Sequence, residues 1–215
     1  MLRLYTYFRS SAAYRVRIAL HLKNLAFEAV PVHLLRNGGE QHAPDYASHN
    51  PAHLVPTLQS DGFSLTQSLA ILEYLDEAYP LPALLPAEPQ ARAHVRALAL
   101  TVACEIHPLN NLRVLRYLKR DLKIEDAPRD AWYRHWVALG FEALERLIAA
   151  PGFTGRFCHG DAPTIADCCL VPQVVNALRL ECPLDAYPAI RQVFAHCQEL
   201  DAFRRAAPAA QADAE

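Results

Sequence analysis

The sequence of 215 residues lacks any long apolar run and any strong excess of charge. No hydrophobic segment approaches the roughly 20 residues that a membrane-spanning helix needs. The formal net charge is only −2, which argues against a general binder of nucleic acid or of anionic membranes, because both depend on a positive surface. The N-terminus, MLRLYTYF, lacks the length and the cleavage site of a signal peptide. These absences predict a cytoplasmic protein with no membrane and no nucleic acid among its partners.

Cysteine and histidine patterns that would bind a metal are also missing. The six cysteines form no CxxC pair and show no zinc-ligand spacing, so we expect buried, reduced thiols. His49 and His53 stand four residues apart, but Pro51 between them disfavours a helical metal-binding face. We therefore expect no metal site.

The composition is that of an ordinary globular protein, with 52% hydrophobic and 20% charged residues. Up to about residue 80, short apolar segments typical of strands alternate with segments whose apolar residues have helical spacing. The predicted elements are strands at 3–8, 27–32, 55–59 and 63–66, the last two joined by the hairpin signal Asp61-Gly62, and helices that include 14–23 and 68–78. The order βαβαββα indicates a mixed sheet flanked by helices.

A proline-rich segment then separates this part from a wholly helical one. Prolines at 80, 82, 86 and 89 predict a stiff linker over 81–89. The predicted helical features are one long apolar stripe over 95–109 with a kink at Pro108, and helices at 129–149, 166–180 and 188–200. A capping box of Thr164 and Asp167 begins the helix at 166–180. The small polar residues 206–215 are expected to be disordered. The fold class is therefore an α/β domain (1–80) followed by an all-α domain (90–215).

Ser10 and Ser11 follow an apolar strand at the start of a helix. Serine in this position is often only a helix cap. A helix start that directly follows a strand also presents free N–H groups and the positive end of the helix dipole to an anion. A hydroxyl there can donate to a thiolate and favour ionisation of a thiol whose free pKa is about 8.5. With no cysteine beside these serines, such a thiol would come from a ligand.

Two further segments have both a structural and a ligand-binding interpretation. Pro56 is either an edge-strand proline or a cis-proline that exposes the backbone of Val55 to an extended peptide. Gln67 and Ser68 begin a helix whose N–H groups are either capped within the chain or hold a carboxylate.

Together these segments resemble the zeta-class glutathione transferases, which include the maleylacetoacetate and maleylpyruvate isomerases. The resemblance rests on Ser10-Ser11 before RVRIAL, on NPAHLVPTL, on QSLAILEYL, on the proline-rich linker and on GDAPTIADCCLVPQV. It covers nearly the whole chain in order, and CEIHPLNNLRVLRYL is especially similar to the maleylpyruvate isomerases.

The resemblance implies a thioredoxin-like N-terminal domain, a helical C-terminal domain, glutathione as cofactor and a homodimer. Glutathione would lie along Val55 and Pro56, and Gln67 and Ser68 would hold its γ-glutamyl end. By position, Gln41, His107 and Asn111 match further glutathione contacts of the family, the last from this chain or from a partner subunit.

Two positions depart from the family pattern. That pattern usually reads Ser-Ser-Cys with Trp or His one residue further on, whereas this chain has Ala12 and Tyr14. Because glutathione supplies the attacking sulfur in the family's mechanism, Ala12 does not abolish the predicted chemistry.

Cis–trans isomerisation of a conjugated enedioic acid requires its double bond to become single for a moment, which a thiolate achieves by adding to a carbon beside a carboxylate. The dianionic substrate calls for arginines, whose planar forks match carboxylates. Arg9 borders the serines, Arg113 follows Asn111 closely, and Arg179 aligns with an arginine that the family uses for substrate carboxylates. Without the alignment, the favoured interpretation of each is a solvated or salt-bridged surface arginine.

Two other functions remain open at this stage. A glutathione transferase that conjugates electrophiles would bind the same cofactor but would need an apolar second pocket. A non-enzymatic binding module of this fold would have no affinity for glutathione. The sequence does not distinguish maleylacetoacetate from maleylpyruvate, because both carry a carboxylate at each end.

Overall fold

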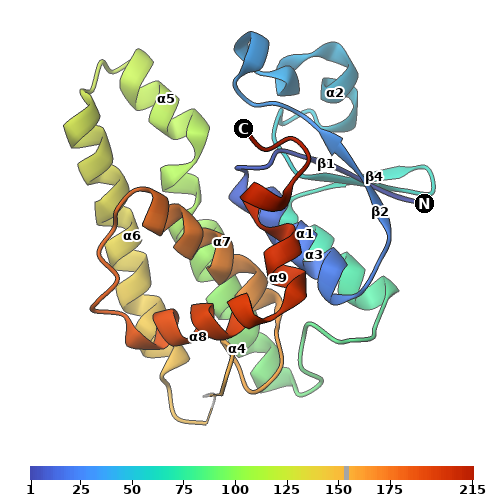
Figure 1. Cartoon of the computed structure of the whole chain (residues 1–215), viewed down its shortest axis with the longest axis vertical. Helices are drawn as coiled ribbons and strands as arrows, with labels where there is room; N and C mark the ends of the chain where they lie inside the picture. Colours follow the sequence, from blue (N-terminus) through green and yellow to red (C-terminus); the bar gives the residue numbers. More distant parts are fainter. Residues whose placement is uncertain (153–154) are drawn as a thin grey trace. The chain divides into compact units, whose positions relative to one another are not determined.

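Two units make up the chain in the computed structural model, which describes residues 1–152 and 155–215 (Figure 1). The first unit comprises Met1–Leu84 together with Gln198–Glu215, and the second comprises Leu85–Cys197. The division at Leu84 falls within the proline-rich segment 81–89. Residues 198–215 group with the first unit, whereas the sequence pattern assigned them to the helical domain.

The first unit is built on a four-stranded mixed sheet in the order β2-β1-β3-β4. Its elements are β1 (Leu2–Thr6), α1 (Ser11–Leu22), β2 (Phe27–Pro31), α2 (Pro44–His49), β3 (Thr57–Ser60), β4 (Phe63–Thr66), α3 (Ser68–Ala78) and α9 (Asp201–Ala206). β1 and β2 are parallel, and β1–β3 and β3–β4 are antiparallel. The order up to α3 is the predicted βαβαββα. Asp61 and Gly62 join β3 to β4 with positive φ at both residues, as the hairpin signal predicts.

The core of this unit lies between the sheet and the helices α1 and α3. Leu4, Leu58 and Leu72 are fully buried, as is Ile18. Each such side chain contributes about 1.5–3 kcal/mol through removal of apolar surface from water. The apolar spacing that predicted the two helices therefore marks the faces that pack on the sheet.

A buried lysine attaches the beginning of the proline-rich segment to the first unit. Lys23 Nζ lies 2.9 Å from the carboxylate of Asp76 and donates to the carbonyls of Tyr79 and Pro82 at 2.7 and 2.8 Å. The same carboxylate oxygen accepts the N–H of Leu84 at 2.7 Å. Because a buried charge is costly unless it is paired, this group of bonds fixes the path of the segment.

The second unit is helical. Its helices are α4 (Pro89–Leu100), α5 (Leu112–Arg120), α6 (Asp126–Ile148), α7 (Ile165–Arg179) and α8 (Pro188–Glu199), the last of which extends beyond the unit boundary. The predicted capping box is present, because the Asp167 side chain accepts the N–H of Thr164 and the Thr164 side chain accepts the N–H of Asp167. The predicted fold class, an α/β domain with an all-α domain, is confirmed.

The long helix predicted over 95–109 is interrupted. After α4, residues Thr101–Ile106 form a π-helical turn, and Pro108–Asn110 form a 3₁₀ turn. The wide turn brings Ile106 onto α6 at Gly140, where a β-carbon would lie 2.2 Å from the Ile106 side chain. Apolar spacing does not reveal such a turn, because one extra residue leaves the stripe nearly unchanged.

Two expectations are wrong. The C-terminal residues 206–215 are ordered, since the backbone N–H of Phe8 donates to Asp213 and the Arg17 side chain donates to the carbonyl of Ala206. Cys104 is exposed, although the other five cysteines are buried as expected. All six are free thiols.

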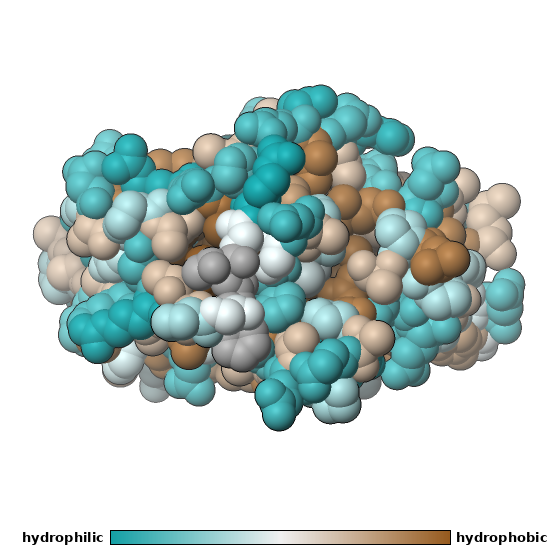
Figure 2. All heavy atoms as spheres, turned by 90° about the horizontal axis from the view of Figure 1, so that it is seen from below, coloured by the Kyte–Doolittle hydropathy of each residue, from teal (hydrophilic) through white to brown (hydrophobic). Residues whose placement is uncertain are grey.

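Hydrophilic and hydrophobic residues are interspersed over the face that Figure 2 shows. Within residues 1–152 and 155–215, no helix combines the length and the apolar character that crossing a membrane requires.

Candidate functional site

Ser10 forms the N-cap of α1. Its backbone is extended, with φ −71° and ψ 112°, and its side-chain oxygen accepts the N–H of Ala13 at 3.2 Å. The helix therefore begins at Ser11, three residues earlier than the apolar spacing indicated. Because a hydroxyl has one proton and two lone pairs, the Ser10 O–H keeps its proton for a ligand. No acidic side chain lies in the first turn of α1, so no carboxylate within that turn opposes the positive end of the helix dipole.

Ser11 and Arg9 flank this cap and differ in exposure. Ser11 is buried, with 6% of its surface exposed, whereas Ser10 is only partly buried. Arg9 is exposed, and its guanidinium carbon lies 5.1 Å from the centre of the Phe8 ring. Of the two serines, Ser10 is therefore the more accessible to a ligand.

The register of the sheet brings three predicted segments to one end of the first unit. Thr57, the first residue of β3, pairs with Tyr5 near the end of β1 and with Thr66 at the end of β4. The end of β1, the start of β3 and the end of β4 therefore meet. The predicted residues that these ends carry are Arg9, Ser10 and Ser11 after β1, Val55 and Pro56 before β3, and Gln67 and Ser68 after β4.

The Val55–Pro56 bond is cis, as one of the two interpretations predicted. Pairing of β3 begins at Thr57, so the backbone of Val55 lies outside the ladder of the sheet. The residue before Val55 is fixed by two hydrogen bonds, because the side chains of Asn50 and Tyr46 both donate to the carbonyl of Leu54. An extended peptide could pair with this backbone as a further strand does.

Gln67 precedes α3 with a left-handed backbone, at φ 70° and ψ 114°. A residue with a β-carbon adopts such a conformation at a cost of about 1–3 kcal/mol, and such residues cluster at functional sites. Ser68 follows at the first position of α3, and its hydroxyl accepts a hydrogen bond from Arg15 of α1 at 3.1 Å. The second turn of α1 is thereby joined directly to the start of α3.

Gln41 lies in the short 3₁₀ turn Glu40–His42 and is buried. Its side chain packs against Gly39, where a β-carbon would lie 2.5 Å from the amide nitrogen. The backbone carbonyl oxygen of Gln41 lies 3.0 Å from Nδ1 of His53, a residue two positions before Val55. Among the described residues, the Gln41 side-chain oxygen has no hydrogen-bond partner. A buried oxygen of this kind fits a ligand that brings N–H groups.

In the second unit, His107 and Asn111 are neighbours. The Asn111 amide nitrogen lies 3.4 Å from Nε2 of His107, and the Asn111 oxygen caps α5 by accepting the N–H of Arg113. Arg113 is exposed on the first turn of α5. These three predicted residues are therefore close to one another because the turn at Pro108–Asn110 leads directly into α5.

Arg179 lies on another element, the last turn of α7, and is exposed. It is close enough to the buried Tyr133 of α6 for its charge to act on that phenol. Burial raises the pKa of Tyr133 to about 12, and the positive charge of Arg179 opposes that rise. The phenol on which this charge acts is therefore neutral at physiological pH.

Comparisons with known proteins identify the family. The model described as "Glutathione S-transferase, N-terminal domain" matches residues 4–83, and the one described as "Glutathione S-transferase, C-terminal domain" matches residues 130–196. The maleylpyruvate isomerase of Ralstonia sp is 50% identical over 213 residues, which cover 99% of each chain. A solved holo structure of a maleylpyruvate isomerase, described as a bacterial zeta-class glutathione S-transferase, superimposes with a TM-score of 0.96 at 48% identity and covers 99% of this chain and 100% of that one. This chain belongs to the zeta-class glutathione transferase family.

A solved structure of maleylacetoacetate isomerase from Methylobacterium extorquens AM1, with bound malonate and GSH, is also similar to this zeta-class chain. Its TM-score is 0.94 at 41% identity, and the match covers 99% of each chain. Relatives of both names are therefore similar to it over their whole length.

Sequence reasoning missed two residues of this zeta-class chain that organise the site. Arg15 and Arg17 are almost completely buried on α1, where Arg15 donates to Ser68 and Arg17 donates to the carbonyls of Tyr7 and Phe8. The available signal was two arginines inside the otherwise apolar helix segment AAYRVRIAL. A charged residue in the buried face of a helix requires partners, and these partners lie at the site.

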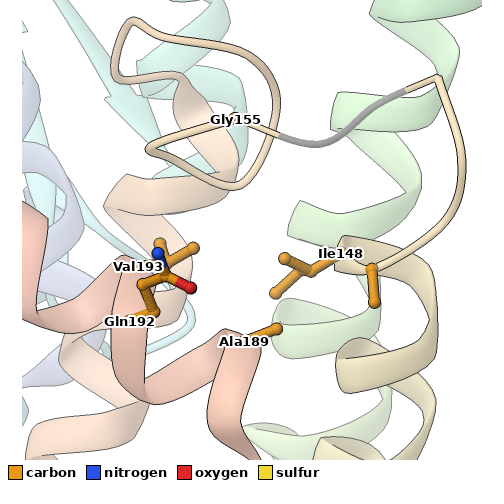
Figure 3. Close-up of a pocket in the computed structure, with 6 residues that line it drawn as sticks. Ile148, Gly155, Ala189, Gln192 and Val193 are labelled. Atoms are coloured by element: carbon orange, nitrogen blue, oxygen red, sulfur yellow. The ribbon is translucent and has the colours of Figure 1, made fainter.

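A hollow of about 230 Å³ lies in the second unit (Figure 3). It is lined by Ile148, Ala149, Gly155, Ala189, Gln192 and Val193. None of these is a predicted site residue, and none carries an ionisable side chain. The residues that line the hollow therefore provide no positive charge for a dianionic substrate.

Proposed function

We propose that this zeta-class protein is a glutathione-dependent cis–trans isomerase, which converts a maleyl-type enedioic acid, maleylacetoacetate or maleylpyruvate, to its fumaryl isomer in aromatic catabolism. One observation carries the proposal. The capped start of α1 with the Ser10 hydroxyl, the free backbone edge at Val55 and the strained start of α3 at Gln67 meet at one end of the sheet. These three features would bind, in that order, the thiol, the backbone and the terminal carboxylate of a tripeptide.

The residues of the first unit fit glutathione. The backbone of Val55 beside Pro56 would pair with the peptide, and the N–H groups at Ser68 would receive the γ-glutamyl carboxylate beside Gln67. The buried oxygen of Gln41 would accept an N–H from the ligand. We propose that His107 and Asn111 of the helical domain add further polar contacts to glutathione.

When bound, glutathione supplies a thiolate that adds to the carbon–carbon double bond of the enedioic acid and leaves again after rotation about that bond. The chain's task is to keep the thiol ionised. Ser10 would donate its proton to the sulfur in a hydrogen bond, and the dipole of α1 would add positive potential, with Ser11 the next donor in line. Each unit by which the site lowers the pKa of the glutathione thiol corresponds to about 1.4 kcal/mol of preference for the thiolate over the thiol.

The dianionic substrate requires cations, which we assign to Arg9, Arg113 and Arg179. All three are exposed and therefore hydrated without substrate. A planar guanidinium donates two parallel hydrogen bonds to a carboxylate, so these residues can both neutralise and orient the ends of the acid. The exposed cations disfavour a transferase for neutral electrophiles, which would need an apolar pocket.

We also propose that the protein is a cytoplasmic homodimer. The six free thiols are compatible with a reducing compartment. The exposed side chains of Phe63 and Leu81 offer apolar surface to a second copy. Light scattering after size-exclusion chromatography would give the mass, and a single mass near that of one chain would contradict the dimer.

One set of assays separates the three functions. An isomerase converts maleylpyruvate or maleylacetoacetate in the presence of glutathione and reacts weakly with a chloroaromatic acceptor. A transferase shows the reverse preference, and a binding module is not retained on a glutathione column. If the protein is retained on the column but isomerises neither maleyl acid, the isomerase proposal is wrong and the transferase becomes the preferred function.

A further inference from the structure

The C-terminal segment of the chain is bonded to the turn that carries Ser10. The backbone N–H of Phe8 donates to Oδ2 of Asp213 at 3.0 Å. Phe8 is only two residues before Ser10, and Asp213 is two residues before the last residue of the chain. A residue at the far end of the sequence therefore fixes the backbone at the beginning of the predicted thiolate site.

Arg17 bonds the same turn from the inside of the unit. Its guanidinium donates to the carbonyls of Phe8 and Tyr7 at 3.0 and 3.3 Å, and to the carbonyl of Ala206 at 3.0 Å. The side chain is fully buried, and burial lowers its pKa to about 10, so the group remains a cation at neutral pH. The negative charge of Asp213 opposes this lowering. One cation thus joins the turn to the end of α9.

The connection extends to the backbone of Ser10 itself. The Ser10 N–H donates to the carbonyl of Tyr7 at 2.9 Å, and this is the carbonyl that also accepts from Arg17. A shift of the turn would therefore move the Ser10 cap. Because hydrogen bonds to charged groups are about twice as strong as neutral ones, Arg17 and Asp213 are well suited to prevent that shift.

Other bonds keep the C-terminal segment in contact with the first unit. The hydroxyl of Tyr14 donates to the carbonyl of Phe203 at 3.3 Å, which holds α9 on α1. At the end of the chain, the Glu215 carboxylate forms an ion pair with Arg36 and lies 3.5 Å from Nε2 of His33. Asp213 lies between these two attachments, so its carboxylate is delivered to Phe8 by a segment that is fixed on both sides.

We propose that the C-terminal segment 207–215 is a positioning element of the thiolate site, in which Asp213, together with Arg17, holds the turn before α1 so that the Ser10 hydroxyl keeps its geometry. This inference rests on the proposed function, because it assigns the segment to the glutathione thiolate. Neither residue needs to touch glutathione. Both act through the backbone of residues 7–10.

Asp213→Ala and Asp213→Asn in the full-length chain test the proposal as a pair. Alanine removes the acceptor for the Phe8 N–H, whereas asparagine keeps an oxygen in the same place. We expect exchange of the Phe8 amide hydrogen in Asp213→Ala to be about tenfold faster or more, as loss of a hydrogen bond to a charged group implies. We also expect a smaller thiolate fraction of bound glutathione at neutral pH and a lower kcat with little change in KM for the maleyl acid. Asp213→Asn should stay within about threefold of the wild type in all four quantities.

Asp185→Ala is the matched control, because the Asp185 side chain is 98% exposed in the second unit. It should leave Phe8 exchange and activity unchanged. The proposal is overturned if Asp213→Ala exchanges the Phe8 amide at the wild-type rate, or if it keeps the wild-type thiolate fraction and kcat despite faster exchange. Failure of the wild-type protein to bind glutathione would instead overturn the proposed function. The exchange rate of the Phe8 amide hydrogen in Asp213→Ala distinguishes these two failures, because it is measured without glutathione and does not depend on glutathione binding.

Discussion

The side-chain oxygen of Ser10 accepts a hydrogen bond from the backbone N–H of Ala13 at 3.2 Å. This bond makes Ser10 the cap of α1 and turns its oxygen toward the helix start. Since the hydroxyl proton is not used in that bond, the capping and thiolate-binding interpretations of this serine are compatible. The same residue can begin the helix and donate to a ligand in front of it.

Ser10→Ala should raise the pKa of the bound glutathione thiol and lower turnover. Loss of one hydrogen bond to a charged group costs about 1.5–3 kcal/mol, which corresponds to roughly 1–2 pKa units. Loss of the cap should also destabilise the protein by about 0.5–2 kcal/mol. Titration of the thiolate absorbance of the complex gives the pKa, and Ser10→Thr, which keeps a hydroxyl, is the control. An unchanged titration would move the donor role to Ser11 or to the helix start alone.

Arg179→Ala should raise KM for the enedioic acid while leaving glutathione affinity nearly unchanged. A charge-assisted fork to a desolvated carboxylate is worth roughly 2–4 kcal/mol, or a factor of about 30 to 1000. Arg179→Lys should restore only part of the loss, because a point charge does not reproduce the planar pair. Steady-state kinetics with both substrates measures this.

Arg146→Ala provides the comparison for Arg179, because Arg146 is an exposed arginine of α6 whose partner is Glu142 on the same helix. It should behave as the wild type. A parallel loss of glutathione binding and isomerase activity in Arg179→Ala would make Arg179 a structural or cofactor-binding residue.

Asp167→Ala should destabilise the helical unit strongly. The carboxylate is fully buried and accepts the backbone N–H groups of Cys158 and Thr164, both at 2.8 Å, and the Thr164 hydroxyl at 2.9 Å. Leaving such donors without an acceptor costs about 2–4 kcal/mol in the free energy of unfolding. Urea denaturation measures it. Glu88→Ala, which removes the exposed cap of α4, should cost clearly less, and equal losses would contradict this account of burial.

Acid should destabilise the protein through two histidines. Burial lowers the pKa of His21 and of His94, so the folded state binds protons less readily at these rings than the unfolded state. Stability is therefore fully present above about pH 6.5 and is lost as the pH falls from there toward the lower folded-state values. Thermal melts over this range should show a falling melting temperature. The double variant His21→Gln/His94→Gln should show a weaker dependence, and an identical slope would contradict the assignment.

Local signals in the sequence predicted much of this molecule. The Asp61-Gly62 turn, the capping box of Thr164 and Asp167, and the strand and helix order of the first 80 residues depend on neighbours close in the chain. The spatial grouping of Ser10 and Gln67 also follows from strand order. The cis form of the Val55–Pro56 bond stood as one of two interpretations, because an edge-strand proline gives the same sequence pattern.

The features that sequence reasoning missed depend on distant partners. Residues 206–215 are small and polar, which is typical of disorder. Their order comes from bonds to Arg17 and Phe8, which lie 189 and 205 residues before their partners Ala206 and Asp213. The π-helical turn before His107 depends on the close approach of Ile106 to Gly140. Neither arrangement leaves a periodic pattern in the sequence. The roles of Gln41, His107, Asn111 and the three arginines came from family resemblance and stay predictions.

The central claim is that the thiolate of glutathione is the group that attacks the maleyl acid. S-methylglutathione tests it most directly, because it keeps the tripeptide contacts but has no free thiol. With the wild-type protein, we expect isomerisation only when glutathione is added, and competitive inhibition by S-methylglutathione against glutathione. Isomerisation without glutathione, or isomerisation supported by S-methylglutathione in its place, would contradict the account.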